Sequence, residues 1–249
     1  MSLLFPTPIF RSTSKALLIG CNYNGETTNQ LRGCIDDVKH MAGYYRSMGI
    51  KDLRVITDSP GELWMPTCTG IRQGFEWLLS DLKKDDVLIL HYSGHGTKVK
   101  NDLLLVPKDY KDRGYIADDE LFSYMMKIPA GVSLFAVFDA CHSGSMLELR
   151  YNYTDGAIIT NKNKETNADI VMISGCGDNQ TSADTFINGL SQGAMSWALL
   201  RSMKENPECS WQELVDTIRK FLKARNYTQI PQLSSGRPLD LTSKFLQFL

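Results

Sequence analysis

The sequence has no long hydrophobic run and no excess of charge of either sign. Its longest strongly apolar segments are residues 87–90 and 134–138, whereas a helix needs about 20 apolar residues to cross a bilayer. The 27 Lys and Arg residues are balanced by 28 Asp and Glu residues, which leaves a net charge of -1. These features exclude a membrane span and make nucleic acid an unexpected partner.

Cysteine is sparse, and no two cysteines lie close together in the sequence. The six cysteines include no C-x-x-C pair, and a chain of 249 residues can build a core without disulfides. Reduced thiols are therefore expected. The first fifteen residues lack a basic start followed by an apolar run, so no secretory signal is predicted. Together these features predict a cytoplasmic protein.

The composition is that of a globular protein with a substantial core. Hydrophobic residues make up 43% of the chain and charged residues 22%, and the length suits one domain. Short β-rich apolar runs alternate with stretches of helical period, which predicts an α/β fold with a mostly parallel sheet. The predicted strands are residues 15–20, 53–57, 86–92, 103–107, 132–139 and 169–174, with a further one near 237–239.

The helices are predicted from apolar residues spaced three or four apart. Residues 31–48 carry one apolar stripe that should pack on the sheet. Ser210 and Glu213 have the spacing of a capping box before a helix over residues 211–222. The polar residues 151–168 are predicted to be an exposed connection. The other predicted helices are residues 69–82, 118–126 and 192–203.

Two segments rich in His, Cys and Gly directly follow predicted strands. HYSGHG ends at Gly96, and DACHSG begins at Asp139. In a parallel sheet, the carboxyl ends of the strands are where catalytic groups gather. Side chains alternate along a strand, so Ser93 should share a face with His95, and Asp139 with Cys141. Each pair should therefore face one cleft.

The order and spacing of His95 and Cys141 are those of caspase-type peptidases, since Cys141 follows His95 by 46 residues. Thiol attack on an amide needs a thiolate and a proton donor for the leaving nitrogen, and one imidazole can serve both needs. His95 and Cys141 are therefore the predicted catalytic dyad, and the amides of Gly96 and Cys141 are predicted to bind the oxyanion. His91 and His95 lack the H-E-x-x-H pattern, so neither zinc nor an organic cofactor is expected.

These segments resemble the two hallmark blocks of the metacaspases, the caspase-related cysteine peptidases of plants, fungi, protists and bacteria. Ala140 stands where Ser or Cys is more usual in that family, which exchanges one small residue for another. The likeness covers most of the chain. Further blocks in the family's order are residues 33–38 (GCIDDV), 116–121, 173–176, 178–184 (DNQTSAD), 193–199 (GAMSWAL) and 231–234.

The resemblance implies a caspase-like three-layer sandwich, in which helices flank a mostly parallel central sheet. It implies one catalytic domain over residues 1–249, with a large p20-like region to about residue 160 and a small p10-like region from about residue 169. There is no Pro- and Gln-rich N-terminal extension and no long insert between the regions. This layout resembles a minimal type I enzyme or an excised core, and the family favours a monomer.

The family also implies an endopeptidase that cleaves proteins or peptides after Arg or Lys. It places Cys34, Asp37, Ser93 and Asp139 around the pocket for the residue before the cut bond. Two carboxylates in a partly desolvated pocket favour a cation, and Arg can bridge them with several charge-assisted hydrogen bonds. The alternative for Asp37 is that it only caps or solvates its helix.

An activating calcium site is a further implication of the family. The acidic positions that match are Asp102, Asp118, Asp119 and Glu148, and Ca²⁺ accepts six to eight oxygens in flexible geometry. The acidic loop over residues 97–102 is shortened, and Glu148 stands where Asp is more common in the family. The ordinary alternative is that Asp118 and Asp119 begin a helix and that Glu148 is surface charge.

Three alternatives concern activity rather than fold. Lys162 and Lys164 in the predicted connection are candidate self-cleavage sites, and a loop that is never cut is the alternative. A catalytically silent relative that serves as a protein-binding scaffold would use the same fold, but the intact His95 and Cys141 argue against it. Another peptidase of the same clan, legumain-like or paracaspase-like, would differ in cleavage preference.

Overall fold

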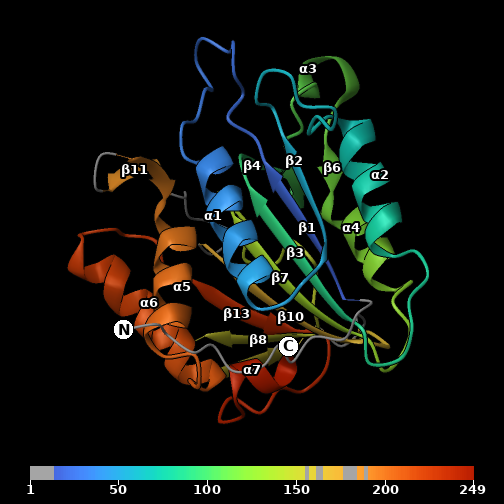
Figure 1. Cartoon of the computed structure of the whole chain (residues 1–249), viewed down its shortest axis with the longest axis vertical. Helices are drawn as coiled ribbons and strands as arrows, with labels where there is room; N and C mark the ends of the chain where they lie inside the picture. Colours follow the sequence, from blue (N-terminus) through green and yellow to red (C-terminus); the bar gives the residue numbers. More distant parts are fainter. Residues whose placement is uncertain (1–13, 155–156, 161–164, 176–183, 188–189) are drawn as a thin grey trace.

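The computed structural model describes residues 14–154, 157–160, 165–175, 184–187 and 190–249. Its centre is an eight-stranded sheet with the order β2-β1-β3-β7-β10-β13-β8-β9 (Figure 1). The pairs from β2 to β10 are parallel, and the pairs from β10 to β9 are antiparallel. The strands are β1 Lys15–Gly20, β2 Asp52–Thr57, β3 Val87–Ser93, β7 Ser133–Asp139, β8 Tyr151–Thr154, β9 Ala157–Thr160, β10 Asp169–Ser174 and β13 Gln232–Ser235.

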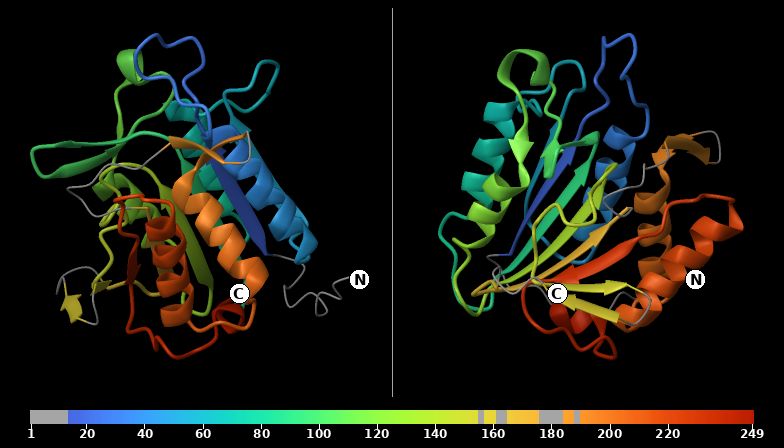
Figure 2. Two further views of the ribbon diagram at one scale, coloured as in Figure 1. Left: turned by 90° about the vertical axis from the view of Figure 1, so that its left-hand side faces the viewer. Right: turned by 180° about the vertical axis from the view of Figure 1, so that it is seen from behind.

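Helices cover both faces of this sheet, which confirms the predicted α/β class (Figures 1 and 2). Ala16 and Leu18 of β1 pack in the core on one face, and Leu17 and Ile19 pack in the core on the other. This alternation follows from the period of two along a strand. The first face is covered by α1 Cys34–Ser47, α5 Ala194–Glu205, α6 Trp211–Ala224 and α7 Phe245–Phe248, and the second by α2 Cys68–Leu78 and α4 Asp118–Met125.

Smaller elements lie around the main sheet. A three-stranded sheet is formed by β4 Gly96–Val99, β5 Asp102–Leu105 and β6 Ile116–Ala117, and β11 Asp184–Ile187 pairs with β12 Leu190–Gly193. The remaining helix is the short α3 Tyr110–Arg113. The predicted strand over residues 103–107 therefore exists as β5, but it belongs to the small sheet.

Two sequence predictions were wrong. The last strand of the sheet is β13 Gln232–Ser235 rather than residues 237–239, because β13 is the segment that pairs with both β10 and β8. Residues 151–168 are not only an exposed connection, since they contain β8 and β9. Tyr153 of β8 is buried and pairs with Leu233. The polar residues around Tyr153 were the reason that the hairpin of β8 and β9 was not predicted. The capping box of Ser210 and Glu213 is confirmed.

The register of the parallel strands aligns the ends that carry the predicted site. Gly20 of β1 pairs with Ser93 of β3, and Ser93 pairs with Asp139 of β7. The loops that follow these three residues therefore begin side by side at one edge of the sheet. None of the helices in the described part of the chain combines the length and the apolar character that a bilayer crossing requires.

Candidate active site

The loops after β3 and β7 bring the two predicted catalytic segments into backbone contact. The Gly94 N–H donates to the carbonyl of Asp139 at 3.3 Å. At Gly96 the backbone lies so close to the carbonyl oxygen of Cys141 that a Cβ there would collide with it. Only glycine fits this position. His95 and Cys141 thus extend from neighbouring segments, which meet where Gly96 lies against the carbonyl of Cys141.

Cys141 differs from the other described cysteines in its exposure. It is half-buried, whereas Cys21, Cys34, Cys68 and Cys209 are buried, and none of these five forms a disulfide. Burial raises the pKa of the Cys209 thiol to about 11 and raises the pKa of Cys21 further above its ordinary value. A buried, protonated thiol is inert. Among these five residues, Cys141 is therefore the most accessible.

The imidazole of His95 is oriented by a backbone carbonyl. Its Nε2 lies 2.7 Å from the carbonyl oxygen of Asn29. Because a carbonyl only accepts hydrogen bonds, Nε2 must carry a proton in this contact. In neutral His95 the lone pair is then on Nδ1, which is the form of the ring that can take a proton from a thiol.

Three of the four predicted pocket residues are connected directly. The Ser93 hydroxyl donates to Oδ2 of Asp37 at 2.8 Å, and Ser93 is the register partner of Asp139. Asp37, Ser93 and Asp139 are exposed by only 3%, 1% and 4%. Cys34, the first residue of α1, is also buried, and its carbonyl lies against Gly20. The structure therefore brings two buried carboxylates to the edge of the sheet that carries Cys141.

Backbone amides from the start of α5 complete this acidic cluster. The Gly193 N–H donates to both carboxylate oxygens of Asp37, at 2.9 and 3.0 Å. The Ser196 N–H donates to Oδ2 of Asp139 at 2.8 Å. A Cβ at Gly193 would lie 2.6 Å from Oδ2 of Asp37 and closer still to Asp139. The small C-terminal region therefore contacts both carboxylates through its backbone.

A buried histidine next to this cluster is part of the core. His91 on β3 is fully buried, and its Nε2 lies 3.1 Å from the hydroxyl of Ser196. Burial lowers the pKa of His91 to about 3, because the interior disfavours the charged ring. His91 is therefore neutral and links β3 to α5.

The four predicted calcium ligands are only partly brought together. Asp118 is buried at the start of α4 and accepts the N–H of Leu103 at 3.2 Å, which places it beside Asp102 at the start of β5. Asp119 is exposed, and Glu148 is half-buried with a φ of 47°. Among the residues that the structure describes, no three His, Cys, Asp or Glu side chains form a group that could hold a metal ion. The residues in this arrangement do not fit a complete calcium site.

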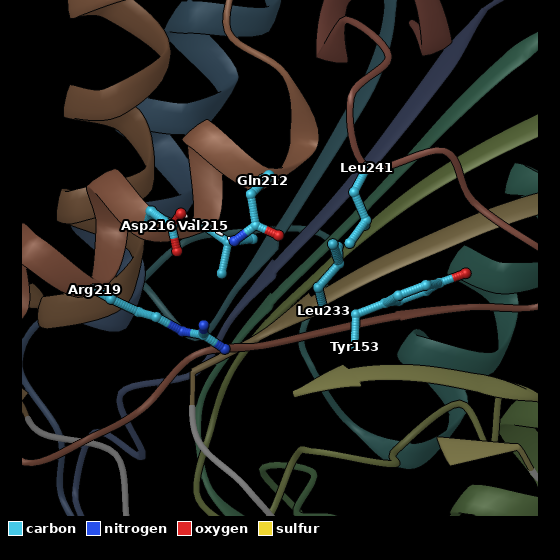
Figure 3. A pocket seen from close by; sticks show the side chains of 7 residues that line it. All are labelled: Tyr153, Gln212, Val215, Asp216, Arg219, Leu233 and Leu241. Atoms are coloured by element: carbon cyan, nitrogen blue, oxygen red, sulfur yellow. Dashed lines mark hydrogen bonds between the residues drawn. The ribbon is translucent and has the colours of Figure 1, made fainter. Parts of the chain in front are cut away.

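One sequence prediction falls outside the described residues, and one cavity was not predicted. Lys162 and Lys164, the candidate self-cleavage sites, lie outside the described residues. A cavity of about 200 Å³ lies between α6 and the strands β8 and β13 (Figure 3). Its Arg219 already donates to the carbonyl of Pro231, and its Asp216 accepts from Gln212. No catalytic role is assigned to this cavity.

Sequence reasoning missed four residues that contact the site. Tyr23 and Asn29 lie in the loop after β1, at the same sheet edge as His95, so the rule about strand ends could have drawn attention to that loop. Gly193 and Ser196 were noted only as part of a family block. They act through backbone amides, and such a role has no signature in residue type.

Comparisons with known proteins find relatives of this chain among the metacaspases. A family model described as "Metacaspase, peptidase C14 domain" matches residues 14–150. Metacaspase-1 of Meyerozyma guilliermondii is 34% identical over 93% of this chain and 72% of that protein. Metacaspase-5 of Trypanosoma cruzi is 38% identical over 98% of this chain and 62% of that protein, so the chain spans less than two thirds of it.

A solved structure confirms the fold. The crystal structure of a Geobacter sulfurreducens protein matches with a TM-score of 0.69, covering 93% of this chain and 97% of that one. The two sequences are 23% identical, so this likeness concerns the fold alone. It agrees with the predicted caspase-like sandwich around a mostly parallel sheet.

Proposed function

Because this chain belongs to the metacaspase family of cysteine-type peptidases, we propose that it is an active endopeptidase with Cys141 as the nucleophile and His95 as the acid and base. One observation carries the proposal. The segments of His95 and Cys141 meet at the carboxyl ends of neighbouring parallel strands, where only glycine fits between them. The orientation of His95 by Asn29 adds support, because it leaves Nδ1 to accept the thiol proton.

The reaction uses these groups in two steps. Nδ1 of His95 takes the proton of the Cys141 thiol, and the thiolate attacks the scissile carbonyl carbon. The oxyanion that forms is bound by the amides of Gly96 and Cys141. His95 then gives its proton to the leaving amine, and the acyl group stays on sulfur. Water activated by His95 hydrolyses this thioester and restores the thiol.

We propose that substrates carry Arg or Lys before the cut bond. The support is the pair of buried carboxylates, Asp37 and Asp139, close to Cys141. A substrate guanidinium or ammonium would be bound by their negative charge, and an Asp side chain would be repelled. Arg should be the better substrate, because its planar group can bridge two carboxylates.

Covalent labelling tests this function. An Arg chloromethyl ketone should alkylate Cys141, detected as a mass increase on the peptide that contains it, and His95→Ala should slow the labelling. A silent scaffold would show no labelling. Another peptidase of the same clan would be recognised by its preference in a peptide-library cleavage profile, which shows whether Arg and Lys are favoured before the cut bond.

We also propose calcium binding at Asp102, Asp118, Asp119 and Glu148, which rests on the family resemblance. Asp102 and Asp118 lie close together, but the described residues do not form a complete site. No step of the reaction is therefore assigned to the ion. Its proposed effect is to bring the loop after Cys141 into its active arrangement.

Titration calorimetry should detect calcium binding that Asp118→Ala plus Asp119→Ala removes. Carboxylates gathered in one place repel each other unless a cation joins them, and calcium accepts several of their oxygens. A chelator should silence peptide hydrolysis by the wild-type protein. Asp52→Ala plus Glu76→Ala removes two other exposed acidic side chains and should leave binding unchanged. Full activity in the chelator would retire the proposal.

Self-cleavage after Lys162 or Lys164 is expected when the active protein is incubated. Both residues match the basic preference proposed for the enzyme. Mass spectrometry of the products should show new ends at these positions. Cys141→Ala should stay intact, and Lys162→Gln plus Lys164→Gln should lose these fragments while still cleaving an Arg peptide. An uncut wild-type chain would contradict this prediction.

A further inference from the structure

Tyr23 is a fully buried side chain that contacts His95 in two ways. It lies in the loop after β1, three residues beyond Gly20. Its hydroxyl accepts a hydrogen bond from the backbone N–H of His95 at 2.9 Å and donates to the carbonyl of Val106 at 2.6 Å. Its ring centre lies 4.6 Å from that of the imidazole, at an angle of 37°. One side chain therefore holds both the backbone and the ring of His95.

Tyr92 holds His95 from the side of the strand. Its hydroxyl donates to the carbonyl of His95 at 2.8 Å. Burial raises the pKa of Tyr23 and of Tyr92 well above the ordinary range, because the interior disfavours a phenolate. Both hydroxyls therefore stay protonated, and the N–H and the C=O of His95 are each bound by a neutral group.

The backbone of Tyr23 takes a conformation that bulky residues rarely adopt. Its φ is 56°, in the left-handed region that favours glycine. A strained residue of this kind persists only where its surroundings fix it, and such residues gather at functional sites. Side chains that bind the two residues next to Tyr23 would therefore fix its backbone.

Asp58, which follows β2, provides this support. Its carboxylate accepts the N–H of Asn22 and the N–H of Asn24, each at 2.7 Å. Nζ of Lys108 lies 3.4 Å from the same carboxylate and also donates to the carbonyl of Asn24. Asp58 is only 4% exposed, and its charge is paired with that of Lys108. The residues on both sides of Tyr23 are thus held in place.

The same loop supplies the acceptor for the imidazole. The N–H of Leu31 donates to the carbonyl of Asn22 at 2.8 Å, which closes the loop. Asn29 lies between them and binds Nε2 of His95. Tyr23 and Asn29 therefore reach His95 from one loop, whose base is held by Asp58.

We propose that Tyr23 is a positioning residue for His95 and that Asp58 acts through it by fixing the turn of residues 22–24. The inference rests on the proposed role of His95 as acid and base. The ring of Tyr23 limits rotation of the imidazole, so that Nδ1 keeps the orientation needed for the thiol proton. The ring face also favours the imidazolium that forms when Cys141 loses its proton.

Steady-state kinetics on an Arg peptide test this role. Tyr23→Phe keeps the ring and loses the hydroxyl, and kcat should fall about tenfold. Tyr23→Leu also loses the ring, and kcat should fall about 100-fold, because a displacement of about 1 Å of a catalytic group has effects of this size. Asp58→Asn should lower kcat by about the same factor as Tyr23→Phe. In all three variants KM should stay within about twofold of the wild-type value, because no substrate contact is removed.

The pH profile separates positioning from loss of folding. In Tyr23→Leu the alkaline limb of kcat/KM should move to lower pH, because the imidazolium has lost the aromatic face. The pH at which iodoacetamide begins to alkylate Cys141 should move upward instead, because the thiolate forms together with the imidazolium that the ring favours. The charged pair of Asp58 and Lys108 is unchanged in this variant. Tyr23→Phe keeps the ring, so its pH profile should match that of the wild-type protein although its kcat is lower.

Tyr45→Phe is the matched control. Tyr45 is also fully buried, but its hydroxyl has no hydrogen-bond partner among the residues that the structure describes, so kcat and the pH profile should not change. If His95→Ala is inactive and both Tyr23 variants behave like Tyr45→Phe, the positioning role is overturned. Full activity of His95→Ala would overturn the proposed function instead. If Tyr23→Leu does not fold, the comparison of Tyr23→Phe with Tyr45→Phe decides.

Discussion

Cys141→Ala should abolish peptide hydrolysis and leave the protein folded. Removing the nucleophile of a catalytic unit costs roughly four orders of magnitude or more in kcat, since the other members cannot form the covalent intermediate without it. Cys141 is half-buried, so the loss of its sulfur opens little space in the core. Thermal unfolding should therefore show a melting temperature close to that of the wild-type protein, while kcat falls below detection.

Cys209→Ala is the control, and it should lower stability while leaving activity unchanged. Cys209 is 3% exposed and belongs to the core under α6, so its loss should cost about 1 kcal/mol of stability. Activity at a temperature where the protein is folded should not change. Hydrolysis by purified Cys141→Ala at the wild-type rate would exclude Cys141 as the nucleophile.

His95→Ala should be nearly as severe as Cys141→Ala. Without the imidazole, neither thiolate formation nor protonation of the leaving amine has a catalyst. The double variant should be no slower than either single variant, because the two groups act as one unit. Additive losses in the double variant would show that they act independently.

The residues proposed as catalytic were predictable because their signals are local. His95 and Cys141 each stand two residues beyond a buried parallel strand, in a segment that contains glycine. An apolar run followed by such a segment is visible in the sequence, and the parallel arrangement then places both segments at one edge. The same reasoning predicted the positions of Ser93 and Asp139, which are register partners.

The remaining contacts depend on residues far apart in the chain. Gly193 and Ser196 reach Asp37 and Asp139 through backbone N–H groups, which every residue except proline possesses. Their positions follow from the packing of α5 on the sheet rather than from residue type. Tyr23 was missed for a similar reason, because it contacts His95 from a loop whose neighbouring amides bind Asp58 of another loop.

Asp37→Asn and Asp139→Asn should each lower kcat/KM for an Arg peptide by roughly thirtyfold or more. Removing one partner of a buried, hydrogen-bonded charge pair costs about 2 kcal/mol or more, and about 1.4 kcal/mol corresponds to a factor of ten. For a peptide with citrulline, the uncharged counterpart of arginine, the same variants should lower kcat/KM much less. The ratio of kcat/KM for Arg over citrulline therefore measures the charge interaction itself.

Asp36→Asn is the matched control, and it should leave the Arg-to-citrulline ratio unchanged. Asp36 neighbours Asp37 on α1 and carries the same charge, but it is only half-buried. If Asp37 only capped its helix, Asp37→Asn would lower stability and leave the ratio intact. The contacts favour the pocket instead, because the cap residue of α1 is Gly33 and the Asp37 carboxylate binds Ser93 and Gly193 from other elements. An unchanged Arg-to-citrulline ratio in both variants would place the pocket for the basic residue elsewhere.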